Sequence, residues 1–433
     1  MEDDPLSRLL SLEKLGIKFG LENIRAICKA LGDPQQAYPT VIVAGTNGKG
    51  SVAAMVETGL RAAGLRTGLY TSPHLVRLEE RFAVAGQPVE RAALAHAAAM
   101  LLDTVEGLRQ DGRLATQPTF FEVTTAIGFE LFRRAGVELA VLEVGLGGRF
   151  DATNVAVPIA GAITTIDLDH ERFLGHTVAQ IAFEKAGVIK PGMRVVVGER
   201  KREALDVIAR VCAERGARLV RADEGLTAEA SVERGRVDVR LRTPAADYGT
   251  LRLSLRGRHQ LDNALVAVRL LEELGALGLP VARGAVVAAV QDTWWPGRLD
   301  LRRDAAGREV LCDAAHNPAG AQVLASYLQE AHPGGLPIVF AVMRDKDVMG
   351  TLAPILPFAS PLILTRPTTE RAMAPEDIAD AARRLGRVTG VEVEPEAGAA
   401  LEAAWSRGGT ICACGSIFLV GEVLARLEGS SQG

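Results

Sequence analysis

A glycine-rich loop that carries one lysine and one serine has the composition of a phosphate-binding site. The loop is Gly45-Thr46-Asn47-Gly48-Lys49-Gly50-Ser51, and it follows an apolar run, 41–44, that is typical of a buried strand. After it, apolar residues recur at helical spacing. Glycines let backbone N–H groups approach a phosphate, the helix start adds a positive dipole, Lys49 supplies a cation, and the Ser51 hydroxyl can bind a divalent metal. The pattern predicts a nucleoside triphosphate site, with a plain glycine turn as the alternative.

Acidic and polar residues follow two more apolar runs. The run 139–144 contains Glu143 near its end, and the run 159–166 is followed by a polar stretch that includes His170. An acid at the carboxyl end of a parallel strand lies where α/β proteins bind ligands, and beside a phosphate loop it can hold Mg²⁺. The alternatives are an acid that caps a loop and a histidine with a structural role.

Strands and helices that alternate along the chain would position these residues. The predicted strands include 139–144, 159–166 and 194–197, and the predicted helices include 90–108, 119–135 and 177–187. Alternation of this kind is typical of a parallel α/β sheet with helices on both faces. Between 231 and 254, short alternating runs predict a small antiparallel sheet instead.

The stretch Trp294-Trp295-Pro296-Gly297-Arg298 is a turn-rich junction and predicts a domain boundary. A second α/β series follows it, with strands predicted at 309–312, 337–341, 361–365 and 410–413 and helices at 318–330 and 375–385. We therefore expect two domains, 1–296 and 297–433. A cleft between two such domains is a usual place for a small-molecule site.

Composition excludes several function classes. The 433 residues carry a formal net charge of −4, and arginines are interspersed with acids, so no nucleic-acid partner is expected. No apolar run approaches the roughly 18 residues of a membrane span. The acidic N-terminus does not fit a secretory or transit peptide. The five cysteines are scattered and match no zinc spacing, so buried free thiols and a cytoplasmic location are expected.

The spelling of the loop, in which Gly50 separates the lysine from the serine, resembles the ATP loop of the Mur ligase superfamily. The similarity is to its folylpolyglutamate synthase and dihydrofolate synthase branch. Further segments match that branch in family order: S-P-H-L at 72–75, T-x-F-E at 119–122, E-V-G-L-G-G-R-x-D-A-T-N at 143–154, E-K-A-G-V-I-K at 184–190, H-Q-x-x-N-A at 259–264, W-P-G-R at 295–298 and D-x-A-H-N-P at 313–318. Gly415-Ser416 also matches, although Ile417-Phe418 replaces the usual tyrosine-containing sequence.

The resemblance implies a fold and a reaction. The expected fold is α/β, with a Mur-ligase-like P-loop ATPase domain built on a parallel sheet and a smaller Rossmann-like C-terminal α/β domain. The expected enzyme is an ATP-dependent ligase that adds L-glutamate to dihydropteroate and to reduced folates through an acyl phosphate. It would use ATP as a substrate with Mg²⁺, two ions being expected, and would act as a monomer without nucleic-acid or membrane partners.

The resemblance also implies roles for individual residues. Catalytic roles are carried over to Lys49, Lys185 and His316, with Lys185 as the position that the family often carbamylates and His316 as a contact for glutamate. ATP binding is expected from Asn47, Gly48, Lys49, Gly50, Ser51, Asn263, Arg298 and Asp313. Metal binding is expected from Ser51, Glu143 and His170. Acceptor or glutamate contacts are expected from Ser72, His74, Thr119, Phe120, Phe121, Glu122, Phe150, Asp151, Ala152, Lys346 and Ser416.

Two other functions are weighed against this interpretation, besides a folylpolyglutamate synthase that lacks the dihydropteroate step. Cell-wall Mur ligases use the same chemistry, but they carry a preceding nucleotide-sugar domain of about a hundred residues, a typical domain size. Because the phosphate loop begins at Gly45, no such domain is expected. A GTP-dependent switch would need a guanine-reading N-K-x-D string, which the sequence lacks.

Overall fold

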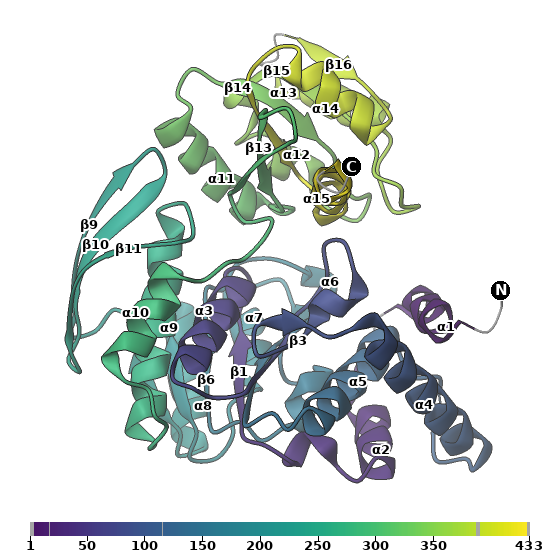
Figure 1. The fold of residues 1–433 in the computed structure, drawn as a ribbon, viewed down its shortest axis with the longest axis vertical. Coiled ribbons are helices and arrows are strands. Elements are labelled where there is room, and N and C mark those ends of the chain that lie inside the picture. Colours follow the sequence, from purple (N-terminus) through teal and green to yellow (C-terminus); the bar gives the residue numbers. More distant parts are fainter. Residues whose placement is uncertain (1–3, 17, 115, 387–389, 431–433) are drawn as a thin grey trace. The chain divides into compact units, whose positions relative to one another are not determined.

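The computed structural model describes residues 4–16, 18–114, 116–386 and 390–430 (Figure 1). The chain forms two compact units. The first unit comprises the described residues of Met1–Ala228 together with Leu241–Leu251 and Asp262–Thr293. The second unit comprises Glu229–Arg240, Arg252–Leu261 and the described residues of Trp294–Gly433. The second unit thus takes two short segments from the N-terminal part of the chain. The predicted division into domains 1–296 and 297–433 stays a prediction.

The first unit is built around an eight-stranded sheet in the order β4-β3-β2-β5-β1-β6-β7-β8. The strands are β1 (Thr40–Ala44), β2 (Thr67–Tyr70), β3 (Phe82–Val84), β4 (Gln87–Pro88), β5 (Leu139–Glu143), β6 (Ala160–Ile163), β7 (Arg194–Val197) and β8 (Arg218–Arg221). All neighbours are parallel except β2 with β3 and β3 with β4. Every residue of β1 and β5 is buried, as expected for strands covered on both faces.

Helices cover this sheet. They are α1 (Pro5–Ser11), α2 (Glu22–Ala30), α3 (Lys49–Ala62), α4 (Arg91–Gln110), α5 (Phe120–Arg134), α6 (Glu171–Leu174), α7 (Val178–Ala186), α8 (Arg202–Glu214), α9 (His259–Ala276), most of which lies in this unit, and α10 (Arg283–Gln291). Helix α3 packs against α10, α4 against α5, and α7 against α8 (Figure 1). None of the helices within the described residues combines the length and apolarity needed to cross a membrane.

The second unit contains a six-stranded sheet in the order β12-β13-β17-β14-β15-β16. The strands are β12 (Asp300–Arg303), β13 (Glu309–Asp313), β14 (Leu336–Phe340), β15 (Ala359–Leu364), β16 (Val391–Val393) and β17 (Thr410–Cys414). Only β12 runs antiparallel to its neighbour. The helices of this unit are α11 (Pro318–Ala331), α12 (Val348–Leu352), α13 (Pro375–Leu385), α14 (Ala397–Trp405) and α15 (Ile417–Ser430).

A separate sheet has the order β11-β10-β9, from β9 (Thr227–Glu233), β10 (Arg236–Arg242) and β11 (Asp247–Arg252). Its tight connections at 234–235 and 243–246 join antiparallel neighbours, as predicted. One predicted strand is shorter than expected, because β6 ends at Ile163 rather than at Ile166. The reason is that the hydroxyls of Thr164 and Thr165 both donate to Asn47 O in the phosphate loop.

Candidate active site

The glycine loop follows β1 and leads directly into α3, which begins at Lys49. Strand β1 lies between β5 and β6, so the loop emerges at the centre of the sheet. Gly45 has φ 149° and Gly48 has φ 85°, both in the region that favours glycine. A side chain at Gly48 would collide with the amide of Asn263, and one at Gly45 would collide with the hydroxyl of Thr164. The two glycines therefore allow the close backbone approach that a phosphate loop requires.

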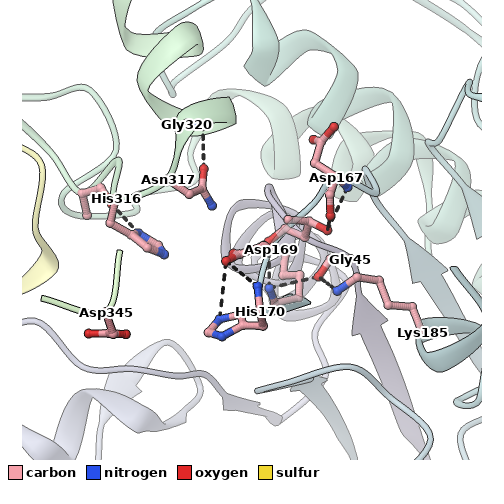
Figure 2. Close-up of polar contacts among 12 residues, drawn as sticks. Gly45, Asp167, Asp169, His170, Lys185, His316, Asn317, Gly320 and Asp345 are labelled. Carbon is pink, nitrogen blue, oxygen red and sulfur yellow. Dashed lines mark hydrogen bonds and ion pairs between the residues drawn. The ribbon is translucent and has the colours of Figure 1, made fainter. Parts of the chain in front are cut away.

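Two lysine side chains converge on one carbonyl of this loop. Lys49 Nζ donates to Gly45 O at 3.1 Å and to Thr46 O at 3.0 Å. Lys185 Nζ, which comes from α7, donates to the same Gly45 O at 2.7 Å (Figure 2). Burial and then the charge of Lys49 lower the pKa of Lys185 to about 7. An anion bound beside these two ammonium groups would be stabilised by their charge.

The segment after β6 is tied to the loop through Thr46. Thr46 N donates to Thr165 O at 2.7 Å, and Asp167 N donates to the Thr46 hydroxyl at 3.0 Å. Lys201 holds the other side of this segment, because its Nζ lies 2.5 Å from Asp167 Oδ1. His170, in a left-handed conformation with φ 50°, donates its N–H to Asp169 Oδ1 at 2.9 Å (Figure 2).

Glu143, the last residue of β5, is buried beside β1. Its Oε2 accepts a hydrogen bond from Ser72 N at 3.1 Å. Two predicted site residues, Glu143 and Ser72, therefore lie in direct contact. His74 accepts a hydrogen bond at Nδ1 from Arg81 Nε at 2.9 Å. Burial and then the charge of Arg81 lower the pKa of His74 to about 4, so this imidazole is neutral and carries its proton on Nε2.

The loop 145–154 is organised by Asp151. Its carboxylate accepts from Gly145 N and Leu146 N, both at 2.9 Å, and from the N–H and hydroxyl of Thr153. Burial raises the pKa of Asp151, while these donors oppose the shift. Ala152 is buried, whereas the Phe150 ring is 39% exposed and lies 6.2 Å from the ring of Phe19.

The predicted acceptor residues of α5 have structural contacts that the sequence motif did not reveal. Thr119 and Glu122 form a capping box, in which Glu122 N donates to the Thr119 hydroxyl and Thr119 N donates to Glu122 Oε2 at 2.8 Å. The Phe120 ring is buried with the Arg81 guanidinium 5.0 Å from its centre. The Phe121 ring packs so closely against Gly145 that no side chain would fit there. The T-x-F-E spacing itself is a capping-box signature and could have predicted the first contact.

Asp313 is the centre of the predicted residues in the second unit. It ends β13, is buried, and accepts from Leu299 N at 2.8 Å and Ala315 N at 2.9 Å. Burial raises its pKa, and the charge of Arg298 opposes the shift. Burial and the same arginine lower the pKa of His259 to about 4. Asp313 and His259 thus both lie within the electrostatic influence of Arg298.

Other predicted residues of the second unit flank the starts of helices. His316 Nδ1 lies 2.9 Å from Ala314 O, which fixes the ring proton on Nδ1 and leaves Nε2 as the acceptor nitrogen (Figure 2). Asn317 caps α11 by accepting from Gly320 N at 2.8 Å. Ser416 is buried and its hydroxyl accepts from Phe418 N. Lys346, just before α12, is half-buried.

The structure thus groups the predicted residues by unit. Residues 47–51, Ser72, Glu143, Lys185 and Asn263 gather around the carboxyl ends of β1, β5 and β6 in the first unit. Arg298 and Asp313 gather at the end of β13 in the second. Among the described residues, no three His, Cys, Asp or Glu side chains form a ready metal cluster.

Comparison with protein families gives two matches. Residues 43–271 match the Mur ligase middle domain, and residues 297–417 match the Mur ligase glutamate ligase domain. The dihydrofolate synthase/folylpolyglutamate synthase of Mycobacterium tuberculosis is 35% identical over 88% of this chain and 82% of its own length. The probable bifunctional folylpolyglutamate synthase/dihydropteroate synthase of Haloferax volcanii is 35% identical over 96% of this chain. The chain spans 49% of that protein's length, and 51% of a relative of the same name from Halobacterium salinarum.

Solved structures agree. The Mycobacterium tuberculosis folylpolyglutamate synthase complexed with ADP and AMPPCP is 33% identical, with a TM-score of 0.89 over 98% of this chain and 99% of that one. A bifunctional folylpolyglutamate synthase/dihydrofolate synthase with Mn, AMPPNP and L-glutamate bound is 30% identical, with a TM-score of 0.82 over 99% and 98%. These matches confirm the predicted fold class and family. The chain belongs to the Mur ligase family, in the branch of the dihydrofolate synthase/folylpolyglutamate synthase enzymes.

Proposed function

We propose that this chain is an ATP-dependent ligase that joins L-glutamate to dihydropteroate and to reduced folates. The observation that carries the proposal is the convergence of Lys49 and Lys185 on Gly45 O in a glycine loop at the centre of the sheet. Two cations at a glycine loop favour a polyanion, and a triphosphate supplies one. The relatives' names supply the acceptor class, because they include both dihydrofolate synthases and folylpolyglutamate synthases.

The reaction would proceed in two steps. A carboxylate oxygen of the pteroate attacks the γ-phosphorus of ATP, the bond to the bridging oxygen breaks, and ADP leaves with an acyl phosphate remaining. The glutamate amine then attacks the acyl carbon, a C–N bond forms, the C–O bond breaks, and inorganic phosphate leaves with a proton lost from the amine. Lys49 and Arg298 would neutralise phosphate charge in the transition states, which requires no side-chain nucleophile.

Mg²⁺ would neutralise the phosphates further when bound. Ser51, Glu143 and His170 are the residues that we propose to hold it, with two ions in all. The side-chain oxygens of Ser51 and Glu143 suit this hard cation. His170 would supply an imidazole nitrogen as a further ligand. The relative solved with Mn and AMPPNP supports a divalent metal beside the nucleotide.

Lys185 is suited to carry a carbamate. Its pKa of about 7 means that much of the amine is neutral at physiological pH, and only a neutral amine attacks CO₂. The new N–C bond releases a proton and turns the side chain into an anion. An anion beside Lys49 replaces repulsion with attraction, so carbamylation relieves the cost of burying the Lys185 ammonium and adds an oxygen ligand for the metals.

The remaining residues divide between the other ligands. In the first unit we propose Asn47, Gly48, Gly50 and Asn263 for ATP. The proposed acceptor contacts are Ser72, His74, Thr119, Phe120, Phe121, Glu122, Phe150, Asp151 and Ala152. In the second unit we propose Asp313 for ATP, and His316, Lys346 and Ser416 for glutamate. We further propose that the domains 1–296 and 297–433 act in a cytoplasmic monomer that has no nucleic-acid or membrane partner.

An isotope-transfer experiment tests the acyl phosphate. Dihydropteroate labelled with ¹⁸O in its carboxylate is incubated with ATP, glutamate and the enzyme, and the released phosphate is analysed by mass spectrometry. One labelled oxygen should appear in each phosphate, because the attacked C–O bond belongs to the original carboxylate. Unlabelled phosphate alongside amide product would reject the acyl phosphate, and labelled phosphate with no amide product would reject glutamate as the amine.

A further inference from the structure

A bidentate ion pair joins the loop 145–154 to helix α7. Arg149 Nη2 lies 2.6 Å and Arg149 Nε 3.1 Å from the two carboxylate oxygens of Glu184. The backbone repeats the link, because Arg149 N donates to Glu184 O at 2.8 Å. Glu184 immediately precedes Lys185, whose Nζ contacts the phosphate loop. One side of the pair thus adjoins Phe150 and Asp151, and the other adjoins Lys185.

Close backbone contacts make this joint rigid. A Cβ at Gly148 would lie 2.8 Å from Lys185 O, and a Cβ at Gly187 would collide with Arg149. Asn154 Nδ2 donates to Arg149 O at 2.9 Å and to Gly187 O at 3.2 Å. The loop and the end of α7 therefore touch through main chain with almost no room between them, so a shift of one moves the other.

The side chain of Arg149 is also held by two aromatic rings. Its guanidinium carbon lies 4.3 Å from the centre of the Phe150 ring and 5.3 Å from that of Phe183. The side chain of Glu184 is 17% exposed, which favours a strong charge-assisted pair. Both rings are partly exposed, and Phe150 is one of the residues that we propose to contact the acceptor.

We propose that Arg149 and Glu184 are positioning residues. Their ion pair holds the loop 145–154 in a fixed position relative to the turn of α7 that carries Lys185. This inference rests on the proposed function. The Arg149 guanidinium packs on the Phe150 ring, and Arg149 anchors the loop that Asp151 organises. Glu184 fixes the turn of α7 from which Lys185 reaches the phosphate loop. Correct placement of the acceptor carboxylate toward the γ-phosphate then depends on the pair, although neither residue touches the reacting atoms.

Variants that keep the size of each side chain test the inference. Arg149→Lys keeps the charge but loses the planar fork, and Glu184→Gln keeps the shape but loses the charge. Equilibrium binding of dihydropteroate is measured by fluorescence, without turnover, in the presence of a β,γ-methylene analogue of ATP. Each variant should weaken pteroate binding about tenfold, while the dissociation constant of the ATP analogue changes less than about twofold. The double variant should be no worse than either single variant, because both act through one contact.

A matched pair elsewhere provides the control. Arg252 and Asp238 form a bidentate pair with both distances at 2.8 Å on the small sheet. Arg252→Lys and Asp238→Asn should leave both dissociation constants unchanged. Additive losses in the Arg149 and Glu184 variants, or equal losses for pteroate and nucleotide, would overturn the inference in favour of general destabilisation. Wild-type enzyme that binds the nucleotide but no pteroate would contradict both the proposed function and this inference, whereas unaltered pteroate binding in the variants would contradict the inference alone.

Discussion

The two units both place charged side chains at the carboxyl ends of their parallel strands, but the charges of the groups there differ. In the first unit, Lys49 and Lys185 share Gly45 O at the end of the central strand β1. In the second unit, the carboxyl of Asp313 ends β13 near the guanidinium of Arg298. The carboxyl ends of parallel strands are thus only a location, and the residue types placed there decide which ligand the location suits.

The two regions also differ in the direction in which burial shifts the pKa of the buried group. Burial raises the pKa of Asp313, while the charge of Arg298 and two backbone N–H donors oppose the shift. Lys185 donates to Gly45 O, and burial and then the charge of Lys49 lower its pKa to about 7, while the charges of nearby aspartates oppose the shift. Because the shift at Lys185 brings its pKa close to physiological pH, we expect the chemistry of the first unit to respond more strongly to mutation and pH.

The largest effect is expected from removing the loop cation. Lys49→Ala should lower kcat/KM for ATP on the order of 10³-fold, as loss of a preorganised charge at a transferring phosphate does. Steady-state kinetics with varied ATP measure the loss. Lys29→Ala on the exposed end of α2 is the matched control and should behave as wild type. Near-normal turnover of Lys49→Ala would remove the assignment of the ATP loop.

Lys185 should show the next largest effect. Lys185→Ala should lose about a hundredfold in kcat, and a small carboxylate such as acetate should restore part of it by replacing the carbamate. Native mass spectrometry of the wild type should show the added mass of CO₂. The same acetate should not help Lys190→Ala, whose amine donates to Asn154 O instead. An unmodified lysine in native enzyme would refute the carbamate.

The lowered pKa of Lys185 also predicts a pH dependence. Between about 7 and 10.5 the unfolded chain holds a proton that the folded, uncarbamylated enzyme releases. The free energy of unfolding of CO₂-free enzyme should therefore rise with pH across this window and level off below it. Carbamate formation should follow the same direction, since it needs the neutral amine. Denaturant titrations at several pH values, with Lys185→Met as the control, measure the slope, and an identical slope in both proteins would contradict the lowered pKa.

Metal dependence should separate the two units. Glu143→Gln and His170→Ala should each raise the Mg²⁺ concentration for half-maximal activity about tenfold, because each removes one proposed ligand. Asp313→Asn in the second unit should raise the KM for ATP while leaving the magnesium titration unchanged. Titrations of the three variants at saturating ATP test this contrast. An unchanged magnesium requirement in both first-unit variants would show that the metals lie elsewhere.

The smallest effects are expected at α5, where structural and binding roles overlap. Phe121→Ala should raise the KM for dihydropteroate about fivefold, which corresponds to about 1 kcal/mol of lost aromatic contact. Glu122→Ala should lower the free energy of unfolding by ~1 kcal/mol through loss of the capping box and should also weaken pteroate use. The KM for ATP should change little in either variant. Equal changes for ATP and pteroate would leave both residues with a structural role only.

Patterns local in sequence predicted most of the fold. Helix α13 (Pro375–Leu385) and strand β7 (Arg194–Val197) match their predicted ranges, and other elements shift by a few residues at their ends. The misjudged end of β6 has a tertiary cause, because the chain leaves the strand where Thr164 turns to Asn47. A local sequence pattern does not predict a hydrogen-bond partner that lies more than a hundred residues away in the chain.

The chemistry of the site divides in the same way. The glycine loop and its lysine were recognisable because all the groups that bind phosphate lie within one short, continuous segment of the sequence. The convergence of Lys185 on Gly45 O and the ion pair of Arg149 with Glu184 were not, because each joins segments that are distant in sequence. Arg81, which contacts both His74 and the Phe120 ring, received no role from the sequence for the same reason.

One assay tests the central claim most directly. ADP release and amide product are measured with purified enzyme, ATP and L-glutamate, with either dihydropteroate or tetrahydrofolate as the acceptor and with each substrate omitted in turn. The account predicts that both acceptors are elongated and that ADP release requires acceptor and glutamate together. If only tetrahydrofolate is elongated, the enzyme is a folylpolyglutamate synthase without the dihydropteroate step. If ADP is released without acceptor and without glutamate, the proposed ligase reaction is wrong.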